Sequence, residues 1–342
     1  MHPKETFNVF LKREKPLRRE KLPSAIRIYC FGHLPRHLQI LLLSLKFIWV
    51  GLLTKTTLTI AGHVNYAPIC FILNRLMGTP YWVVAHGLEV WNLQGLLRKI
   101  ALRNADRILA VSTYTRERLL KEQLLDPNRV VVLPATFDAE RFKITPKPQH
   151  LLTKYNLHPK QPVILTVTRL TPYKGYNQIL KALPKIRCSI PDVHYLLVGT
   201  GNDVPHIQAL VEKLNLQDSV TLAGFVPDNE LCDYYNLCDL FAMPSSGEGF
   251  GIVFLEALAC GKPVLAGYCD GSTEPLQQGQ LGCLVNPDDV HQIADSAVQI
   301  LSGMYQHPLI YNSEALRQLV VARFGFTKFR QALDALILDY VK

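Results

Sequence analysis

The chain has 342 residues, of which 48% are hydrophobic and 19% are charged, so it is neither disordered nor limited to one small domain. Its net charge of +9 is uneven. Residues 1–150 hold 23 Lys and Arg against 10 Asp and Glu, whereas residues 151–342 carry a small negative charge. A basic half favours an anionic surface or ligand, with lipid headgroups or a lipid-phosphate acceptor as candidates. No basic-aromatic module is present, so nucleic acid is not expected as a partner. A solvated tail is the alternative, because KREKPLRREK (12–21) alone contributes +4.

Three features bear on the compartment. The eight cysteines are scattered and include no C-x-x-C pair, which is typical of a reducing compartment and supports neither a zinc site nor a thioredoxin-like motif. The first residues are polar and charged where a secretory signal would be apolar. The longest apolar run, 40–53, contains Lys46 and is shorter than the roughly 20 residues of a membrane span, so we expect a buried helix. The prediction is a cytoplasmic protein that is at most peripheral on the inner face of the membrane.

Short apolar segments alternate with helical ones along the chain. After a polar leader, strands are predicted at 26–31, 57–62, 82–87, 107–112 and 130–134, and helices at 38–53, 68–77, 94–104 and 114–123. Residues 143–161 are rich in proline and polar residues, which indicates a domain junction. The pattern then restarts, with strands that begin at PVILTVTRL, YLLVGTG, VTLAGFV, LFAMPS and PVLAGY.

Apolar strands separated by helices are typical of parallel sheets covered on both faces. The sequence therefore predicts an α/β protein with two Rossmann-like doubly wound domains that face each other across a cleft. The predicted bounds are 1–146 and 147–326, followed by an amphipathic C-terminal helix in 327–342 that is available to pack back toward the N-terminal domain. Folds of this class bind ligands at the carboxyl ends of their strands.

VTRLTPYKG (167–175) carries two cations at the end of a predicted strand. Arg169 leaves the strand and Lys174 lies in the turn before a helix, so the two side chains can meet one diphosphate from two directions. Gly175 permits close backbone approach where the helix N-terminus adds its positive end. The alternative is an ordinary loop with two solvated cations, and this segment alone does not separate the two interpretations.

PSSGEGFGIVFLEALACGKPV (244–264) is a glycine-rich loop that leads into a helix. Its glycines interleave with Glu248 and Phe250, and such a loop presents bare amides to an anion. Glu256 falls among apolar helix residues, where a carboxylate is costly unless it has a partner such as the vicinal hydroxyls of a ribose. Glu248 can accept hydrogen bonds from the hydroxyls of a sugar. The alternative is a plain turn followed by a charge on the helix surface.

Glu248 and Glu256 form an E-x7-E motif, which is preceded about 75 residues earlier by the R-x4-K of Arg169 and Lys174. Together with ALACGKPV, this combination resembles the retaining GT-B glycosyltransferases of family 4 (glycosyl transferases group 1). VVAHGLEVW, ADRILAVSTYTRERL, LLVGTGND, LAGFVPDNEL and LGCLVNPDD are also similar. The resemblance covers roughly residues 57–340.

The resemblance implies a role for each candidate residue. Arg169 and Lys174 would bind and neutralise the donor diphosphate, Glu256 the ribose and Glu248 the donor sugar. His86, in AHG, would reach the reacting sugar from the N-terminal domain; the alternative is a buried, hydrogen-bonded histidine at a strand end. Backbone groups would complete the site, namely the amides of Gly249, Phe250 and Gly251 at the sugar and phosphates, and the main chain of Phe225 and Val226 at the base.

The resemblance also implies the reaction, which is transfer of a hexose from a UDP- or GDP-sugar to a glycan or lipid-linked acceptor in polysaccharide or glycolipid biosynthesis. The anomeric configuration would be retained by same-face attack, with the leaving phosphate taking the acceptor proton. Fixed cations and a helix N-terminus would stabilise the departing charge. No D-x-D motif is present, so neither a metal nor another cofactor is expected.

The chain departs from the family pattern in two places. Ala135 stands where family members often have Asn-Gly, and no glycine loop follows a first strand. We therefore expect the N-terminal domain to lack its first strand–loop–helix. This leaves a second hypothesis, an N-terminally incomplete and catalytically weak protein that binds a nucleotide sugar. Acceptor-dependent release of UDP or GDP separates the two. A nucleotide-sugar epimerase is a third hypothesis, against which the E-x7-E and R-x4-K motifs argue.

Overall fold

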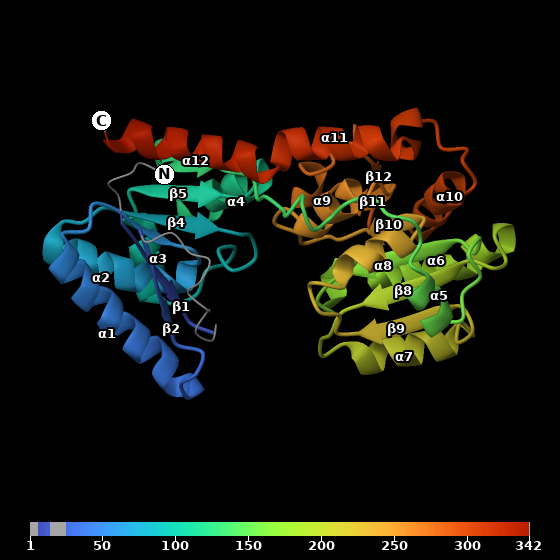
Figure 1. Ribbon diagram of the computed structural model, residues 1–342, viewed down its shortest axis with the longest axis horizontal. Coiled ribbons are helices and arrows are strands. Elements are labelled where there is room, and N and C mark those ends of the chain that lie inside the picture. Colours follow the sequence, from blue (N-terminus) through green and yellow to red (C-terminus); the bar gives the residue numbers. More distant parts are fainter. Residues whose placement is uncertain (1–5, 14–24, 342) are drawn as a thin grey trace. The chain divides into compact units, whose positions relative to one another are not determined.

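The computed structural model describes residues 6–13 and 25–341, and it confirms the α/β class with parallel sheets (Figure 1). Contacts between residues divide the chain into two compact units. Unit 1 comprises residues 1–85, 93–109 and 125–129, and unit 2 comprises 86–92, 110–124 and 130–342. Each unit has a parallel sheet with helices packed against it, as buried apolar strands require.

Unit 1 contains two sets of strands. β1 (Phe7–Leu11) and β2 (Ile26–Cys30) form a parallel pair, with Phe7 opposite Ile26. A second sheet has the strand order β3 (Thr59–Ala61), β4 (Tyr81–Ala85), β5 (Arg107–Ala110) and β6 (Val130–Val132), although β6 is counted with unit 2. The helices are α1 (Arg36–Thr54), α2 (Ala67–Met77) and α3 (Leu96–Arg103).

The leader contains a strand that the sequence did not predict. FNVFL alternates outward and inward positions, and its Phe10 stacks on Tyr29 of β2 with ring centroids 4.8 Å apart. The short strand was overlooked because charged residues surround it. Residues 14–24 lie outside the described part of the chain, so the expected absence of a first strand–loop–helix stays a prediction.

The prediction that α1 is a buried helix was wrong. Leu43 and Val50 are buried, and Gly51 lies so close to Leu73 of α2 that a Cβ atom would be 2.6 Å from Cδ2 of that leucine. The opposite side is open, with Trp49 55% exposed. Within the described residues α1 is the one helix long and apolar enough to cross a membrane, a test that soluble core helices and signal sequences also pass.

Unit 2 has a six-stranded parallel sheet in the order β12-β11-β10-β7-β8-β9. The strands β7 (Val163–Val167) and β8 (His194–Val198) are buried along their whole length, which explains their apolar sequences. The other strands are β9 (Val220–Gly224), β10 (Leu240–Met243), β11 (Val264–Gly267) and β12 (Cys283–Val285). This is the doubly wound order in which the chain reverses direction across the sheet between β7 and β10.

The helices of unit 2 are α4 (Thr113–Gln123), α5 (Gln149–Lys154), α6 (Tyr176–Ser189), α7 (Val204–Lys213), α8 (Leu231–Leu237), α9 (Ile252–Ala259), α10 (Val290–Leu301), α11 (Ser313–Phe324) and α12 (Phe326–Val341). The expected C-terminal helix is therefore present as α12. α5 lies inside the expected domain junction and was not predicted. All eight cysteines are free thiols.

Candidate functional site

The candidate site forms where β7 and β10 end side by side. β7 leads into the loop that carries Arg169 and into a 3-10 turn, Pro172–Lys174, before α6. β10 leads into the glycine-rich loop and then α9. The two loops touch, because the amide of Ser246 donates to the carbonyl of Tyr173 at 2.9 Å. The R-x4-K and E-x7-E segments therefore meet at the reversal point of the sheet, where ligands bind in this fold class.

Lys174 and Glu248 form an ion pair across these two loops, with side chains only 13% and 15% exposed. Because both side chains are largely buried, the residues around them fix the geometry of the pair, whereas a surface pair is open to solvent. Gly175 is required beside it, because it has a φ of 83° and a Cβ atom would lie 2.2 Å from the carbonyl oxygen of Pro244. The structure thus brings together two of the predicted residues and excludes the interpretation of Lys174 as a solvated loop cation.

Asp270 holds the glycine-rich loop in place and was missed by the sequence analysis. This carboxylate is 2% exposed and accepts hydrogen bonds from the amide of Glu248 at 2.6 Å and from the hydroxyl of Ser245 at 2.8 Å. Burial raises the pKa of Asp270, and these hydrogen bonds oppose that rise. An acidic residue just beyond β11 was the available signal, because its strand end lies beside that of β10.

Glu256 lies one turn into α9 and is 9% exposed, so the interpretation as a helix-surface charge is wrong. The Tyr235 hydroxyl of α8 donates to Oε2 of Glu256 at 2.7 Å. Burial raises the pKa of Glu256, opposed by the Tyr235 hydrogen bond and by the charge of Arg141. The carboxylate is therefore partnered in part by protein, and Tyr235 is a second residue that the sequence analysis missed.

The AHG loop and the glycine-rich loop approach each other closely within unit 2. A Cβ atom on Gly249 would lie 1.9 Å from the carbonyl oxygen of His86, so only glycine fits there. The amide of His86 donates to Glu89 at 2.5 Å and the residue is exposed, which contradicts the alternative of a buried core histidine. The predicted neighbours Phe250 and Gly251 behave differently, since Phe250 is buried at 3% exposure and Gly251 caps α9 with a φ of 90°.

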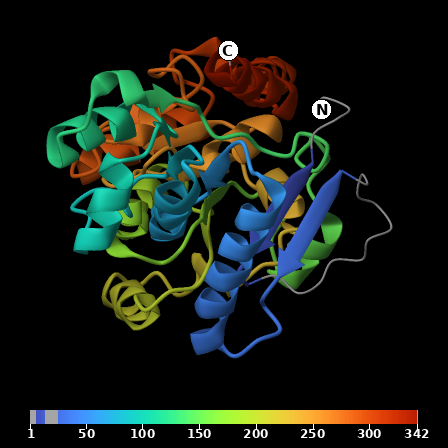
Figure 2. The ribbon, with the colours of Figure 1, turned by 90° about the vertical axis from the view of Figure 1, so that its left-hand side faces the viewer.

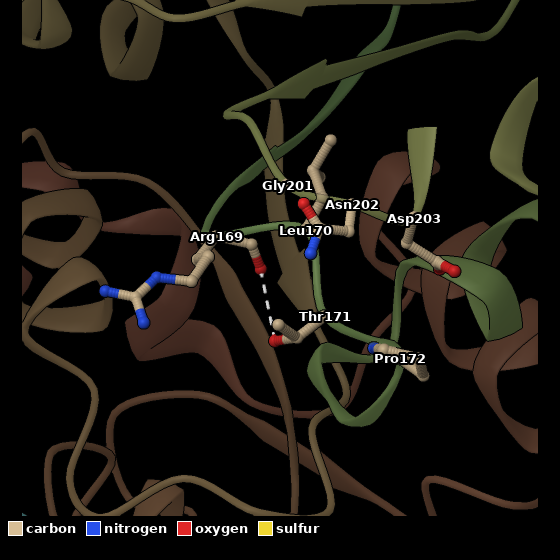
Figure 3. Close-up of a pocket in the computed structure, with 7 residues that line it drawn as sticks. All are labelled: Arg169, Leu170, Thr171, Pro172, Gly201, Asn202 and Asp203. Carbon is tan, nitrogen blue, oxygen red and sulfur yellow. Dashed lines mark hydrogen bonds between the residues drawn. The ribbon is translucent and has the colours of Figure 1, made fainter. Parts of the chain in front are cut away.

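Arg169 lies at the edge of a pocket formed by residues 169–172 and 201–203 (Figure 3). Its exposed side chain points away from Asn202 and Asp203, which line the other side of the pocket with Gly201. The Thr171 hydroxyl donates to the carbonyl of Arg169 at 3.4 Å. The guanidinium is therefore presented to solvent and available to an incoming anion.

The remaining predicted positions follow β9, two strands from the reversal point. Phe225 is 73% exposed, whereas Val226 is buried at 6%. The exposed aromatic ring of Phe225 is a surface on which a planar ring can stack. The cationic side chains, helix N-termini and bare amides at the ends of β7 and β10 form an arrangement able to bind a diphosphate.

Two family models match the chain. One, described as Glycosyl transferases group 1, matches residues 150–315, and one described as Glycosyltransferase Family 4 matches residues 9–141. The first covers the residues of the candidate site in β7 to α9. The second begins within β1, at residue 9.

Curated relatives are similar to the chain over much of its length. A GDP-mannose-dependent alpha-(1-6)-phosphatidylinositol monomannoside mannosyltransferase of Mycolicibacterium smegmatis is 33% identical over 64% of this chain and 59% of that protein. The N-acetyl-alpha-D-glucosaminyl L-malate synthase of Bacillus anthracis is 26% identical over 82% of this chain and 74% of that protein. The chain thus spans less than two thirds of the length of the mannosyltransferase.

Solved structures share the fold. Sucrose-phosphate synthase of Thermosynechococcus elongatus has a TM-score of 0.79 at 22% identity and covers 98% of this chain and 88% of that one. HepE of Anabaena in complex with UDP has a TM-score of 0.76 at 20% identity, with coverage of 92% and 86%. Both likenesses extend over almost the whole chain and establish its fold.

Proposed function

Because the chain belongs to glycosyltransferase family 4 and has the GT-B fold, we propose that it transfers a hexose from a nucleoside-diphosphate sugar to a glycan or lipid-linked acceptor. The observation that carries this proposal is the Lys174–Glu248 ion pair at the reversal point of the unit 2 sheet. A cation and a sugar-binding carboxylate meet there beside the N-terminus of α6. The product would serve polysaccharide or glycolipid biosynthesis.

The chemistry follows from where charge develops. The departing diphosphate gains negative charge in the transition state, and fixed cations stabilise it more than they stabilise the ground state. Lys174 is held by Glu248 before the donor binds, so little reorganisation is needed. Arg169, which is exposed, would close on the diphosphate from the other side. These groups neutralise the leaving group without a metal ion.

The donor sugar and its ribose would be bound by carboxylates. Glu248, in the glycine-rich loop, would accept hydrogen bonds from the hydroxyls of the donor sugar. Glu256 would accept hydrogen bonds from the ribose hydroxyls. The anomeric configuration would be retained, because the leaving phosphate can take the acceptor proton on the face that it leaves. In this mechanism Glu248 is a positioning carboxylate and no covalent sugar–enzyme bond is formed. His86 would contact the reacting sugar from the AHG loop.

GDP-mannose is the first donor to test, because the mannosyltransferase relative is named as dependent on it. UDP-sugars form the second group, because the HepE structure contains UDP. The proposed location is the cytoplasm, at the inner membrane surface when the acceptor is lipid-linked. The basic charge of residues 1–150 supports a lipid-linked acceptor.

The experiment is a thermal-shift panel of UDP- and GDP-sugars followed by an assay of nucleoside-diphosphate release with and without glycan and lipid acceptors. A donor at 100 times its Kd should stabilise the fold by about 2.7 kcal/mol. Release of UDP or GDP that requires an acceptor supports transfer. Donor binding without any release would favour the alternative of a weak or inactive nucleotide-sugar-binding protein, and no binding of either donor class would contradict the proposal.

A further inference from the structure

An open apolar face runs along α1 in unit 1. Leu41, Leu45, Trp49 and Leu52 are 53%, 57%, 55% and 43% exposed. They recur at intervals of three or four residues, so they share one side of the helix. We define these four residues as the α1 face. A contiguous exposed apolar surface of this kind marks a protein or membrane contact.

The packing of α1 fixes which side faces outward. Gln39, Leu43 and Val50 are buried on the opposite side, where Leu43 joins Phe31 and Ile69 in a small core cluster. Figure 1 shows α1 on the outer side of α2, and Figure 2 shows it in the foreground of unit 1. Because one side is held by this core, α1 would rest in a membrane surface along its length and would not span it.

The charge of the residues around α1 indicates which kind of partner covers the α1 face. No acidic residue occurs between Glu20 and Glu89, whereas six Lys and Arg do. Lys46, beside the α1 face, lies with Nζ 4.1 Å from the ring centroid of Trp49, so its charge sits at the edge of the apolar surface. A face of leucines and tryptophan with cations at its margin matches the boundary between acyl chains and anionic headgroups.

A basic pocket lies in the same unit, beside the first turns of α1. It is lined by Ile40 of α1 together with Lys12, Arg13 and Arg98. Leu96 and Leu97 also line it and are 75% and 50% exposed. Each cation near an anionic lipid surface adds attraction that salt weakens. A second copy of the chain would bring an equally basic surface, so like charges disfavour that occupant.

We propose that the α1 face docks on an anionic lipid bilayer, with the leucines and Trp49 entering the acyl boundary and the neighbouring cations contacting lipid phosphates. This inference goes beyond sugar transfer, because Arg169, Lys174, Glu248 and Glu256 all belong to unit 2. Donor binding in solution and vesicle binding are therefore separable properties of the chain.

The test uses the full chain and phosphatidylcholine vesicles with or without phosphatidylglycerol. Trp82 and Trp91 are buried at 0% and 5% exposure, so Trp49 is the tryptophan available to the membrane. Lipids brominated on their acyl chains should quench its fluorescence when phosphatidylglycerol is present. Trp49→Phe should keep binding and lose this quenching. High salt should weaken binding.

A double variant tests the energetic role of the face. Leu45→Ser with Leu52→Ser should reduce vesicle binding by about tenfold or more, because two leucines lose their transfer from water. Its thermal midpoint should stay unchanged, since both side chains are exposed. Met304→Ser, which removes a 63% exposed side chain from unit 2, is the matched control and should bind as the wild type does.

Three outcomes would overturn the proposal. The first is binding to neutral and anionic vesicles alike, unaffected by salt. The second is binding to anionic vesicles without quenching of Trp49, or with full affinity in the double variant. The third is a dimer in solution that the double variant dissociates, which would assign the α1 face to a second copy.

Discussion

α1 of unit 1 and α9 of unit 2 are both strongly apolar helices, but they differ in how much of each helix is buried. Six of the eight residues of α9 are buried, including Glu256. α1 has 19 residues, of which four are buried. α9 packs against α11 on one side and α8 on another, and its Phe254 meets Phe241 of β10 with ring centroids 5.8 Å apart. Among the described residues, α1 packs against α2 and β1 and leaves the α1 face open.

Apolar composition sets the affinity of a helix for a non-aqueous environment, whereas the neighbouring elements determine whether the protein interior provides that environment. The protein interior surrounds α9, and a carboxylate placed there acquires a raised pKa. For α1 we propose that a lipid bilayer provides the apolar environment on the side of the α1 face.

Truncating one aromatic residue in each helix should separate them most clearly. Phe254→Ala removes a fully buried ring and should lower the free energy of unfolding by about 3–5 kcal/mol. Trp49→Ala removes a half-exposed ring and should change it by about 1 kcal/mol or less. Chemical denaturation of both variants measures this. Similar losses in the two variants would contradict the exposure of Trp49 on the α1 face.

Removing a site cation should affect the donor more than the fold. Arg169→Ala and Lys174→Ala should each weaken nucleoside-diphosphate binding roughly ten- to hundredfold, because a charge-assisted hydrogen bond contributes about 1.5–3 kcal/mol. Arg169→Ala is the cleaner variant, because Lys174→Ala also leaves Glu248 without its partner.

Lys185→Ala is the matched control for these cations. Lys185 is 44% exposed and pairs with Asp295 at 2.7 Å in the same unit. Calorimetric titration should give it wild-type donor affinity. If the folded Arg169 and Lys174 variants also keep wild-type affinity, the assignment of the diphosphate site is wrong.

Glu256→Gln should raise stability while it lowers donor affinity. Burial raises the pKa of Glu256 in the folded state above its ordinary value of 4.5. At pH values between 4.5 and the folded-state pKa, the folded chain therefore keeps a proton on Glu256 that the unfolded chain has released. Stability therefore falls as pH rises through this window. The variant removes that loss and should be more stable than the wild type at neutral pH.

Denaturation as a function of pH, with Glu140→Gln as an exposed control, checks this sign. A lower stability of Glu256→Gln at neutral pH would show that the charged carboxylate contributes to the fold through Tyr235 and Arg141. Unchanged donor affinity would remove the ribose-binding role from Glu256.

Chelation should have the smallest effect. Donor binding and transfer should survive EDTA, because Lys174, Arg169 and the N-terminus of α6 neutralise the diphosphate. Vesicle binding through the α1 face should survive it as well. Loss of donor binding that manganese or magnesium restores would contradict the metal-independent mechanism.

Several features of the fold and site were predictable because they depend on residues close in sequence. Strand ends mark the position of Arg169 and Lys174, and a glycine loop before an apolar helix marks Glu248. Asp270 and Tyr235 were not predictable in the same way, since they meet their partners 22 and 21 residues away only after the sheet has formed. The exposure of α1 was missed for the same reason, because burial depends on how many neighbours the fold provides.

The most direct test of the central claim is hydrogen–deuterium exchange of the full chain with and without GDP-mannose and UDP-glucose. One donor should slow exchange in the loops that carry residues 169–175 and 245–251, and should leave α1 unchanged. Slower exchange in both loops would support a nucleotide-sugar site at the Lys174–Glu248 pair. Saturating donor that protects neither loop, or protects only segments of unit 1, would contradict it.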